Sequence, residues 1–180
     1  MKQKVVKGLL WKLLENGGAQ GVQFVIAIIL ARLLTPAQYG VVGIITIFIT
    51  IANVVVQSGF STALVQKQKA DKVDFSSVCY FDLFVSLVMY GILYAAAPVI
   101  ASFYGIAELE AIVRVLSIVL FPGAVISVQT AYVSRNLEFK GLFLSTLAAS
   151  VASGVISIWM AANGFGVWAM VGQQVSYYFV

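Results

Sequence analysis

Apolar residues lie along this chain in long runs that are interrupted by short polar segments. Five runs are expected to form helices, at residues 15–34, 40–60, 78–103, 112–133 and 142–162, and a sixth begins at residue 167. Each of the five approaches the roughly 20 residues that a helix needs to cross a ~30 Å hydrocarbon core. The sixth, residues 167–180, makes only about 21 Å of helix, which is too short to cross. We therefore expect the sequence to be a truncated piece of a longer membrane protein.

Proline and glycine mark the predicted helix ends. Thr35 and Pro36 are unfavourable for continuing a helix, and Gly40 is a second expected breaker, so the first two helices should fold back at a short turn. Pro122, which a glycine follows, should bend the fourth helix because proline removes a backbone hydrogen bond. Residues 163–166 predict a tight turn before the last helix.

Composition decides the fold class. Of the 180 residues 61% are hydrophobic and 10% are charged, with a mean hydropathy of +0.99. A soluble domain carries about 25% charged residues, so lipid must solvate much of this surface. The sequence therefore predicts an all-α, polytopic membrane helix bundle of about six transmembrane helices, in one domain over residues 1–180.

The sequence offers little for catalysis or cofactor binding. It contains no histidine and one cysteine, so the commonest general base and the usual disulfide and metal frameworks are missing. Phosphate-binding glycine loops and nucleophile-elbow motifs are also absent. We expect no enzyme activity, no cofactor and no metal site.

Basic residues predict the orientation in the membrane. With a cytoplasmic N-terminus, nine of the eleven Lys and Arg residues fall in inner segments, as the positive-inside rule requires. Those nine are Lys2, Lys4, Lys7, Lys12, Lys67, Lys69, Lys72, Arg135 and Lys140. Residues 1–14 form a basic amphipathic lead-in, which we interpret as retained rather than as a cleaved signal peptide. The net charge of +4 is explained by topology, so no nucleic-acid partner is expected.

Polar side chains recur at helical spacing inside the apolar runs. Gln20 and Gln23 share a face of the first helix, and Asn53 and Gln57 share a face of the second. Lipid offers no hydrogen bonds, so these faces should turn inward, either for helix packing or to line a polar cavity. Small and hydroxylated faces on the fourth and fifth helices are expected to serve packing: Ser127, Ala131, Ser134, Thr146, Ser150, Ser153 and Ser157.

Three ionisable residues inside or beside the spans have two interpretations each. Arg32 and Arg114, near the outer ends of the first and fourth helices, either snorkel to the headgroups or bind an anionic ligand, since guanidinium holds phosphate in a bidentate fork. Asp82, expected about one turn into the third helix, is either an interfacial carboxylate or a proton or cation site.

Three segments resemble a known family. Residues 31–40, Ala-Arg-Leu-Leu-Thr-Pro-Ala-Gln-Tyr-Gly, are similar to the first helical hairpin of bacterial polysaccharide exporters, the O-antigen, colanic-acid and teichuronic-acid type flippases. Residues 57–66 resemble the stretch that closes their second helix, and residues 135–140 resemble the loop after their fourth. The likeness covers most of the chain.

This resemblance implies a fold, a substrate and a location. It implies a protein of twelve or more helices in two six-helix lobes, of which this chain is most of the N-terminal lobe, in the bacterial cytoplasmic membrane. The activity implied is the flipping of undecaprenyl-diphosphate-linked oligosaccharide by alternating access, for cell-surface polysaccharide synthesis. Arg32 and Arg114 would contact the diphosphate and the amides of the first two helices would replace sugar hydration. Membrane lipids and a polysaccharide polymerase or export machinery are the further partners implied.

Two other functions remain open from the residues. The same superfamily contains cation-coupled multidrug or solute extruders, for which Asp82 would be the coupling carboxylate. A non-transporting remnant is the third possibility.

Overall fold

The chain is helical throughout its described part. The computed structural model describes residues 2–57, 71–136 and 139–180, with side chains from residue 17 onward except at 72 and 135–139. The elements are α1 (Lys2–Leu33), α2 (Pro36–Val56), α4 (Lys72–Tyr104), α5 (Glu108–Leu116), the short 3₁₀ helix η1 (Ser117–Val119), α6 (Leu120–Asn136), α7 (Phe139–Ala162) and α8 (Val167–Phe179). The predicted all-α class is confirmed.

Four segments have the length and the apolar composition to cross a membrane: Pro36–Val56, Val73–Tyr104, Glu108–Ser134 and Lys140–Ala162. Gly17–Leu33 in α1 is a shorter apolar helix. Large apolar side chains such as Phe24, Phe84 and Val155 are more than 60% exposed, as expected where the solvent is lipid. The protein is thus a multi-pass membrane protein.

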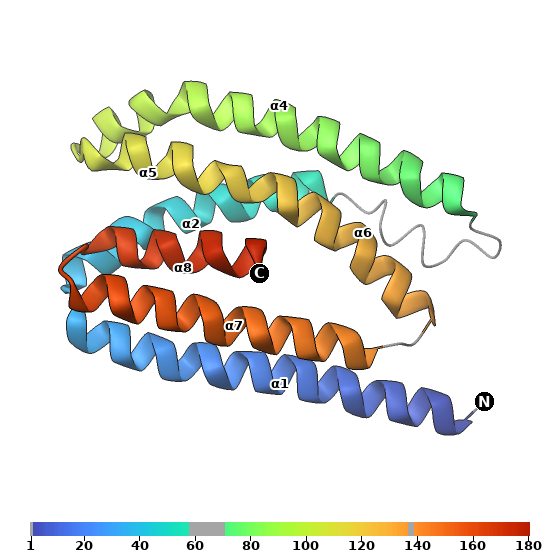
Figure 1. Ribbon diagram of the computed structural model, residues 1–180. Helices are drawn as coiled ribbons and strands as arrows, with labels where there is room; N and C mark the ends of the chain where they lie inside the picture. The colour runs from blue at the N-terminus through green and yellow to red at the C-terminus, as the bar shows by residue number, and fades with distance from the viewer. Residues whose placement is uncertain (1, 58–70, 137–138) are drawn as a thin grey trace.

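The chain runs back and forth between two ends of the bundle (Figure 1). The connections at residues 34–35, 105–107 and 163–166 lie together at one end, which we call the turn end. The start of α1, the end of α2, the start of α4 and the end of α6 lie toward the opposite end. This alternation matches the predicted order of passes. Residues 58–70, which include the predicted inner Lys67 and Lys69, and residues 137–138 lie outside the described residues.

The turn between α1 and α2 forms as predicted. Thr35 caps α2, with Pro36 as its first residue. The backbone N–H of Thr35 donates to Gln38 Oε1 at 2.8 Å, and the N–H of Gln38 donates to Thr35 Oγ1 at 3.4 Å. This reciprocal pair satisfies N–H groups that the first turn of a helix leaves free. Gly40 is not a breaker, because it lies inside α2.

The two helices joined by this turn do not pack along each other. α1 packs along α7, and α7 packs on α8 (Figure 1). Gly154 of α7 makes room for the side chain of Ile26 in α1: a β-carbon at 154 would lie 2.8 Å from Ile26 Cγ1. One hydrogen bond still joins α2 to α1, from the Tyr39 hydroxyl to the Ala27 carbonyl at 3.1 Å.

Helix α8 joins two apolar clusters. One cluster unites α2, α4, α5 and α6, and it includes Val167 and Val171 of α8. The other unites α1, α7 and the α1–α2 turn, and it includes Ala169 of α8. Because alternate residues of α8 contribute to both, this helix holds the two groups of helices together.

Several predicted helix starts need correction. The third predicted helix starts at Lys72 rather than 78, because polar residues form its first turns and an apolar pattern does not detect them; the Asp71 N–H donates to Asp74 Oδ2 at 3.0 Å there. The first predicted helix starts at Lys2 rather than 15, and the fourth at Glu108 rather than 112. Helix α2 starts at Pro36 rather than 40 because proline fits the first helical position. Its predicted end at residue 60 lies outside the described residues.

The bend predicted at Pro122 is confirmed. The path from Glu108 to Asn136 is interrupted by η1 one turn before Pro122, which has no N–H to offer the carbonyl of Ile118. Beyond this break α6 changes direction relative to α5 (Figure 1).

Candidate functional site

A cavity of about 920 Å³ lies between α6, α7 and the last residues of α8. Gln57, just after α2, also lines it. The wall on α6 includes Gln129, Thr130 and Ser134, and the wall on α7 includes Ser145 and Thr146. Tyr177 and Tyr178 of α8 complete it. A volume of this size falls within the range of small-molecule sites.

Three helices meet beside this cavity at Gly123, one of its lining residues. A β-carbon there would lie 3.3 Å from Asn53 Oδ1 of α2 and 3.6 Å from Tyr178 Cε1 of α8. A β-carbon there would require the Asn53 side chain to shift by a few tenths of an ångström. Asn53 Oδ1 is buried and accepts no hydrogen bond within the described residues, so an acceptor is left unsatisfied next to the cavity.

The four predicted amides occupy different environments. Gln57 lines the cavity and Asn53 lies beside it. Gln23 accepts a hydrogen bond from Gln173 Nε2 of α8 at 2.8 Å, and so serves packing between α1 and α8. Gln20 is exposed on α1. The structure therefore brings the two α2 amides to the cavity and leaves the two α1 amides away from it.

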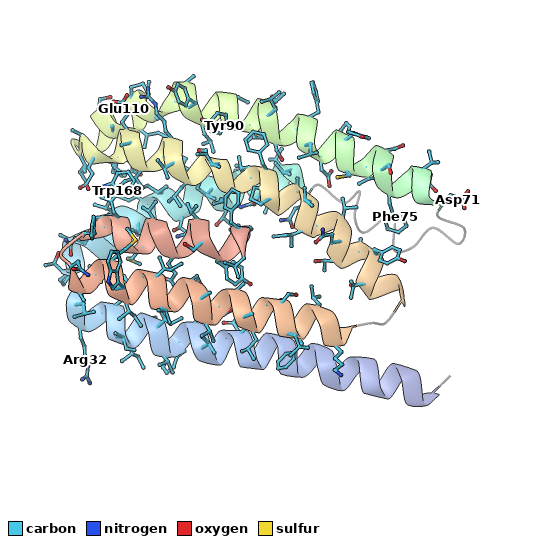
Figure 2. The ribbon with its side chains drawn as sticks, in the orientation of Figure 1. Arg32, Asp71, Phe75, Tyr90, Glu110 and Trp168 are labelled. Atoms are coloured by element: carbon cyan, nitrogen blue, oxygen red, sulfur yellow. The ribbon has the colours of Figure 1, made fainter. Side chains whose placement is uncertain are left out.

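The two arginines do not line the cavity. Arg32 is exposed at the turn end of α1, with its side chain directed away from the bundle (Figure 2). Arg114 lies at the α4–α5 contact, where its guanidinium forms an ion pair with Glu110 at 2.8 Å and lies 4.3 Å from the centre of the Tyr94 ring. Of the two, Arg32 is the more accessible to a ligand.

Asp82 is fully buried, and neither carboxyl oxygen has a hydrogen-bond partner within the described residues. Next to it, Ser86 Oγ donates to the Asp82 carbonyl at 2.8 Å and to the Leu120 carbonyl of α6 at 3.2 Å. Because α4 starts at Lys72, Asp82 lies about 15 Å along the helix rather than one turn into it. Its two interpretations, an interfacial carboxylate or a proton or cation site, stay predictions.

The serines of α7 serve packing, as predicted. Ser150, Ser153 and Ser157 are fully buried. Ser153 Oγ donates to the Ser150 carbonyl at 3.1 Å, and Ser157 Oγ donates to the Gly154 carbonyl at 2.9 Å. On α6, Ser127, Ala131 and Ser134 line the cavity, as does Thr146 of α7, so their predicted packing role stays a prediction. Beyond the bend before Pro122, α6 leaves the line of α5 and runs toward the start of α7 (Figure 1).

Several lining residues were not predicted as site residues. Gln129, Thr130, Ser145, Tyr177 and Tyr178 were missed because the spacing along a single helix does not reveal which helices diverge.

Comparison with known proteins places the chain in a family. A family model described as "Polysaccharide biosynthesis protein" matches residues 29–180. The chain belongs to this family. It is similar to the succinoglycan biosynthesis transport protein ExoT of Rhizobium meliloti (strain 1021), with 25% identity over 169 residues. The aligned residues cover 94% of this chain and 34% of ExoT.

Two more relatives agree with this assignment. The teichuronic acid biosynthesis protein TuaB of Bacillus subtilis (strain 168) is 29% identical over 152 residues, covering 84% of the chain and 31% of the relative. An uncharacterized membrane protein in the cps region of Klebsiella pneumoniae is 21% identical over 164 residues, covering 87% and 34%. This polysaccharide biosynthesis family member thus spans about a third of the length of these relatives. No solved structure matches it.

Proposed function

We propose that the full-length protein flips undecaprenyl-diphosphate-linked oligosaccharide across the bacterial cytoplasmic membrane for cell-surface polysaccharide synthesis. The observation that carries this proposal is a cavity of about 920 Å³, lined by apolar side chains together with amides and hydroxyls, in a membrane helix bundle of a polysaccharide biosynthesis family. Two relatives named for succinoglycan transport and teichuronic acid biosynthesis support it.

In the proposed mechanism the cavity opens alternately to one face of the membrane and then to the other. The cavity is lined by α6 from Pro122 onward and by the start of α7, while the apolar clusters that α8 joins fill the turn end. The helical break at η1 and the glycine contact at Gly123 are suitable hinge positions, because both lie where α6 leaves α5. Movement of α6 would then open or close the cavity wall.

Arg32 is the proposed contact for the lipid diphosphate. Its exposed guanidinium at the end of α1 is accessible from the bilayer and can hold phosphate in a bidentate fork. Gln20 lies on the same helix and is also exposed, so it remains a proposed sugar contact together with Gln23, Asn53 and Gln57. Arg114 has a weaker case because Glu110 already pairs with it.

The test is complementation of a bacterial strain that lacks its own oligosaccharide flippase. The protein in full length, as its gene encodes it, should restore surface polysaccharide. Arg32→Ala should lower export more than Arg32→Lys, since lysine keeps the charge and loses only the bidentate geometry. Lys140→Ala is the matched control, because it removes an exposed cation at the opposite end of the bundle. No export despite normal amounts in the membrane would refute the proposed function.

A second candidate function, cation-coupled extrusion of drugs or solutes, is favoured by Asp82. A buried carboxyl group with no partner within the described residues is costly unless it carries a proton or a cation. If this function is correct, Asp82→Asn should abolish efflux that is driven by a proton or sodium gradient. Unchanged drug susceptibility and efflux in Asp82→Asn would remove the candidate.

A further inference from the structure

We infer that the bundle consists of two rigid groups of helices that pivot against each other at the turn end. The first group is α1, α7 and α8, and the second group is α2, α4, α5 and α6 (Figure 1). The inference concerns how the bundle moves, and it holds for either candidate function. It is carried by helix α8, whose two faces make contacts of opposite kinds.

The face of α8 toward α1 and α7 is interlocked with them. A β-carbon at Gly172 would lie 2.5 Å from Met160 Sδ of α7, so this sulfur is seated directly on the backbone of α8. At the next residue, Gln173 Nε2 donates a hydrogen bond to Gln23 Oε1 of α1 at 2.8 Å. One face of α8 therefore holds both of its neighbours in the first group.

Helices α1 and α7 are interlocked in the same way, because the side chain of Ile26 is seated on Gly154. A side chain that fills the groove over a glycine has to pass over the neighbouring residues before the two helices can slide. The three helices of the first group are thus fixed against sliding along one another.

The face of α8 toward the second group is smooth. Val167 and Val171 belong to the apolar cluster of α2, α4, α5 and α6, and Val175 packs against this cluster. The three valines recur every four residues and form one stripe along the helix. Their side chains are short and have no polar atom. Small sliding movements of packed helices are a common way in which domains change shape, and an aliphatic stripe of this kind permits them.

The second group is also held together from within. Ser86 Oγ of α4 donates to the Leu120 carbonyl at the start of α6 at 3.2 Å. Toward the other end of α6, the rings of Phe75 in α4 and Tyr132 pack edge to face with their centres 5.6 Å apart. Helix α6 is therefore tied to α4 on both sides of Pro122, and we expect the two helices to move as one.

The turn end carries the contacts that suit a pivot. Gln38, in the first turn of α2, accepts a hydrogen bond from the Thr35 N–H through Oε1, and its Nε2 would lie 2.6 Å from a β-carbon at Gly166, just before α8. The Tyr39 hydroxyl donates to the Ala27 carbonyl of α1 at 3.1 Å. The start of α2 is thus joined to both α1 and α8 there. Movement between the groups should increase with distance from this end.

The experiment measures distances between pairs of spin labels by pulsed electron paramagnetic resonance, in the full-length protein reconstituted into lipid bilayers. All native cysteines are first replaced by serine, and each label replaces an exposed side chain. Phe84→Cys with Ile126→Cys reports on α4 and α6 inside the second group. Ile126→Cys with Leu144→Cys reports on α6 and α7 across the groups, away from the turn end. Phe103→Cys with Trp159→Cys reports across the groups at the turn end.

We expect a broad or two-peaked distance distribution between positions 126 and 144, and one narrow peak for each of the other pairs. A distribution between 126 and 144 as narrow as the other two would show one rigid bundle and overturn the inference. An equally broad distribution between 84 and 126 would place the movement inside the second group, at η1, and also overturn it. A broad distribution between 103 and 159 would reject the pivot at the turn end.

Two glycine variants test the pivot contact itself. Gly164 and Gly166 have φ values of 81° and 54°, so alanine strains the backbone at both positions. A β-carbon at 166 would also displace Gln38, whereas within the described residues nothing lies within 4 Å of a β-carbon at 164. Gly166→Ala should therefore shift the distance between 103 and 159, and Gly164→Ala should leave it unchanged. Equal distances in the two variants would reject Gln38 as part of the pivot.

The three label pairs are measured without either glycine variant, so they decide the inference even if Gly166→Ala does not fold. Export in the complementation strain is scored separately from the distances. Export by a protein whose three distributions are all narrow rejects the two groups and leaves the flippase standing. Loss of export with the expected distributions rejects the proposed function and leaves the two groups standing.

Discussion

At the scale of single residues, the closest fit in the bundle is between Gly154 of α7 and Ile26 of α1. A β-carbon at 154 would lie 2.8 Å from Ile26 Cγ1 and closer still to the end of that side chain. Ile26 is 5% exposed and belongs to the cluster that α1 shares with α7 and α8. Since lipid provides no hydrophobic force between helices, such close packing is what holds α1 in place.

Gly154→Ala should therefore destabilise the protein by about 1–3 kcal/mol through overpacking against Ile26. Gly141→Ala is the control in the same helix, because nothing lies within 4 Å of a β-carbon there. Alanine is the better helix former, so the control should be neutral or slightly stabilised. Thermal unfolding of the full-length protein in detergent measures both. Adding Ile26→Ala to Gly154→Ala should recover part of the loss, and equal unfolding temperatures for the two glycine variants would contradict the packing.

Residue identity predicted some of these roles and missed others. Ser150, Ser153 and Ser157 were expected to serve packing because small hydroxylated residues let helices approach closely, and all three are buried. Ser134 has the same chemistry but lines the cavity. The difference depends on how α6, α7 and α8 are placed relative to one another, which is set by the whole bundle. The predicted roles of Arg32 and Arg114 in binding substrate stay predictions.

At the scale of helices, local signals located the turns and did not determine the partners. Thr35 and Pro36 end α1 and start α2 by backbone geometry and capping alone. Whether α2 then lies along α1 depends on distant surfaces, and here α7 with its glycine and serines takes that place. The start of α4 was missed for a different reason, because its first turns are polar while the prediction followed apolar residues.

The α1–α7 pairing predicts a specific cross-link. The Ile26 Cβ atom and a β-carbon at 154 would be 4.0 Å apart, within the usual range for a disulfide. In a Cys79→Ser background, Ile26→Cys combined with Gly154→Cys should cross-link on oxidation, since the new cysteine at 26 also removes the atoms that would clash. A protease site is inserted between residues 66 and 69, and the protein is cleaved there after oxidation. On a denaturing gel the cross-linked protein should then still run as one band, because the disulfide joins its two fragments.

The control for this cross-link pairs Ile26→Cys with Gly43→Cys on α2, where nothing lies within 4 Å of a β-carbon. This second pair should stay reduced. If it cross-links as readily as the first, then α1 lies along α2 after all, as a hairpin of two packed helices would require.

At the scale of the whole molecule, the alternating passes sort the chain into two ends. Glu108 begins α5 at the turn end, and Lys140 lies in the first turn of α7 at the other end (Figure 1). The sequence predicted this sorting well because charge and hydropathy act on each segment independently. It could not predict the cavity, which arises from the angle between α6 and α7 and from the position of α8 between the two apolar clusters.

The distribution of basic residues predicts which end faces the cytoplasm. We expect the N-terminus and Lys140 inside, and Glu108 outside. In a Cys79→Ser background, Glu108→Cys should react with a membrane-impermeant maleimide added to intact spheroplasts, because the side chain at this position is exposed. Lys140 is also exposed, so Lys140→Cys should react with the same reagent, but only after the membrane is permeabilised. The reverse pattern would invert the topology. It would also move the mouth of the cavity to the outer face, where a lipid-linked oligosaccharide made in the cytoplasm would not enter it.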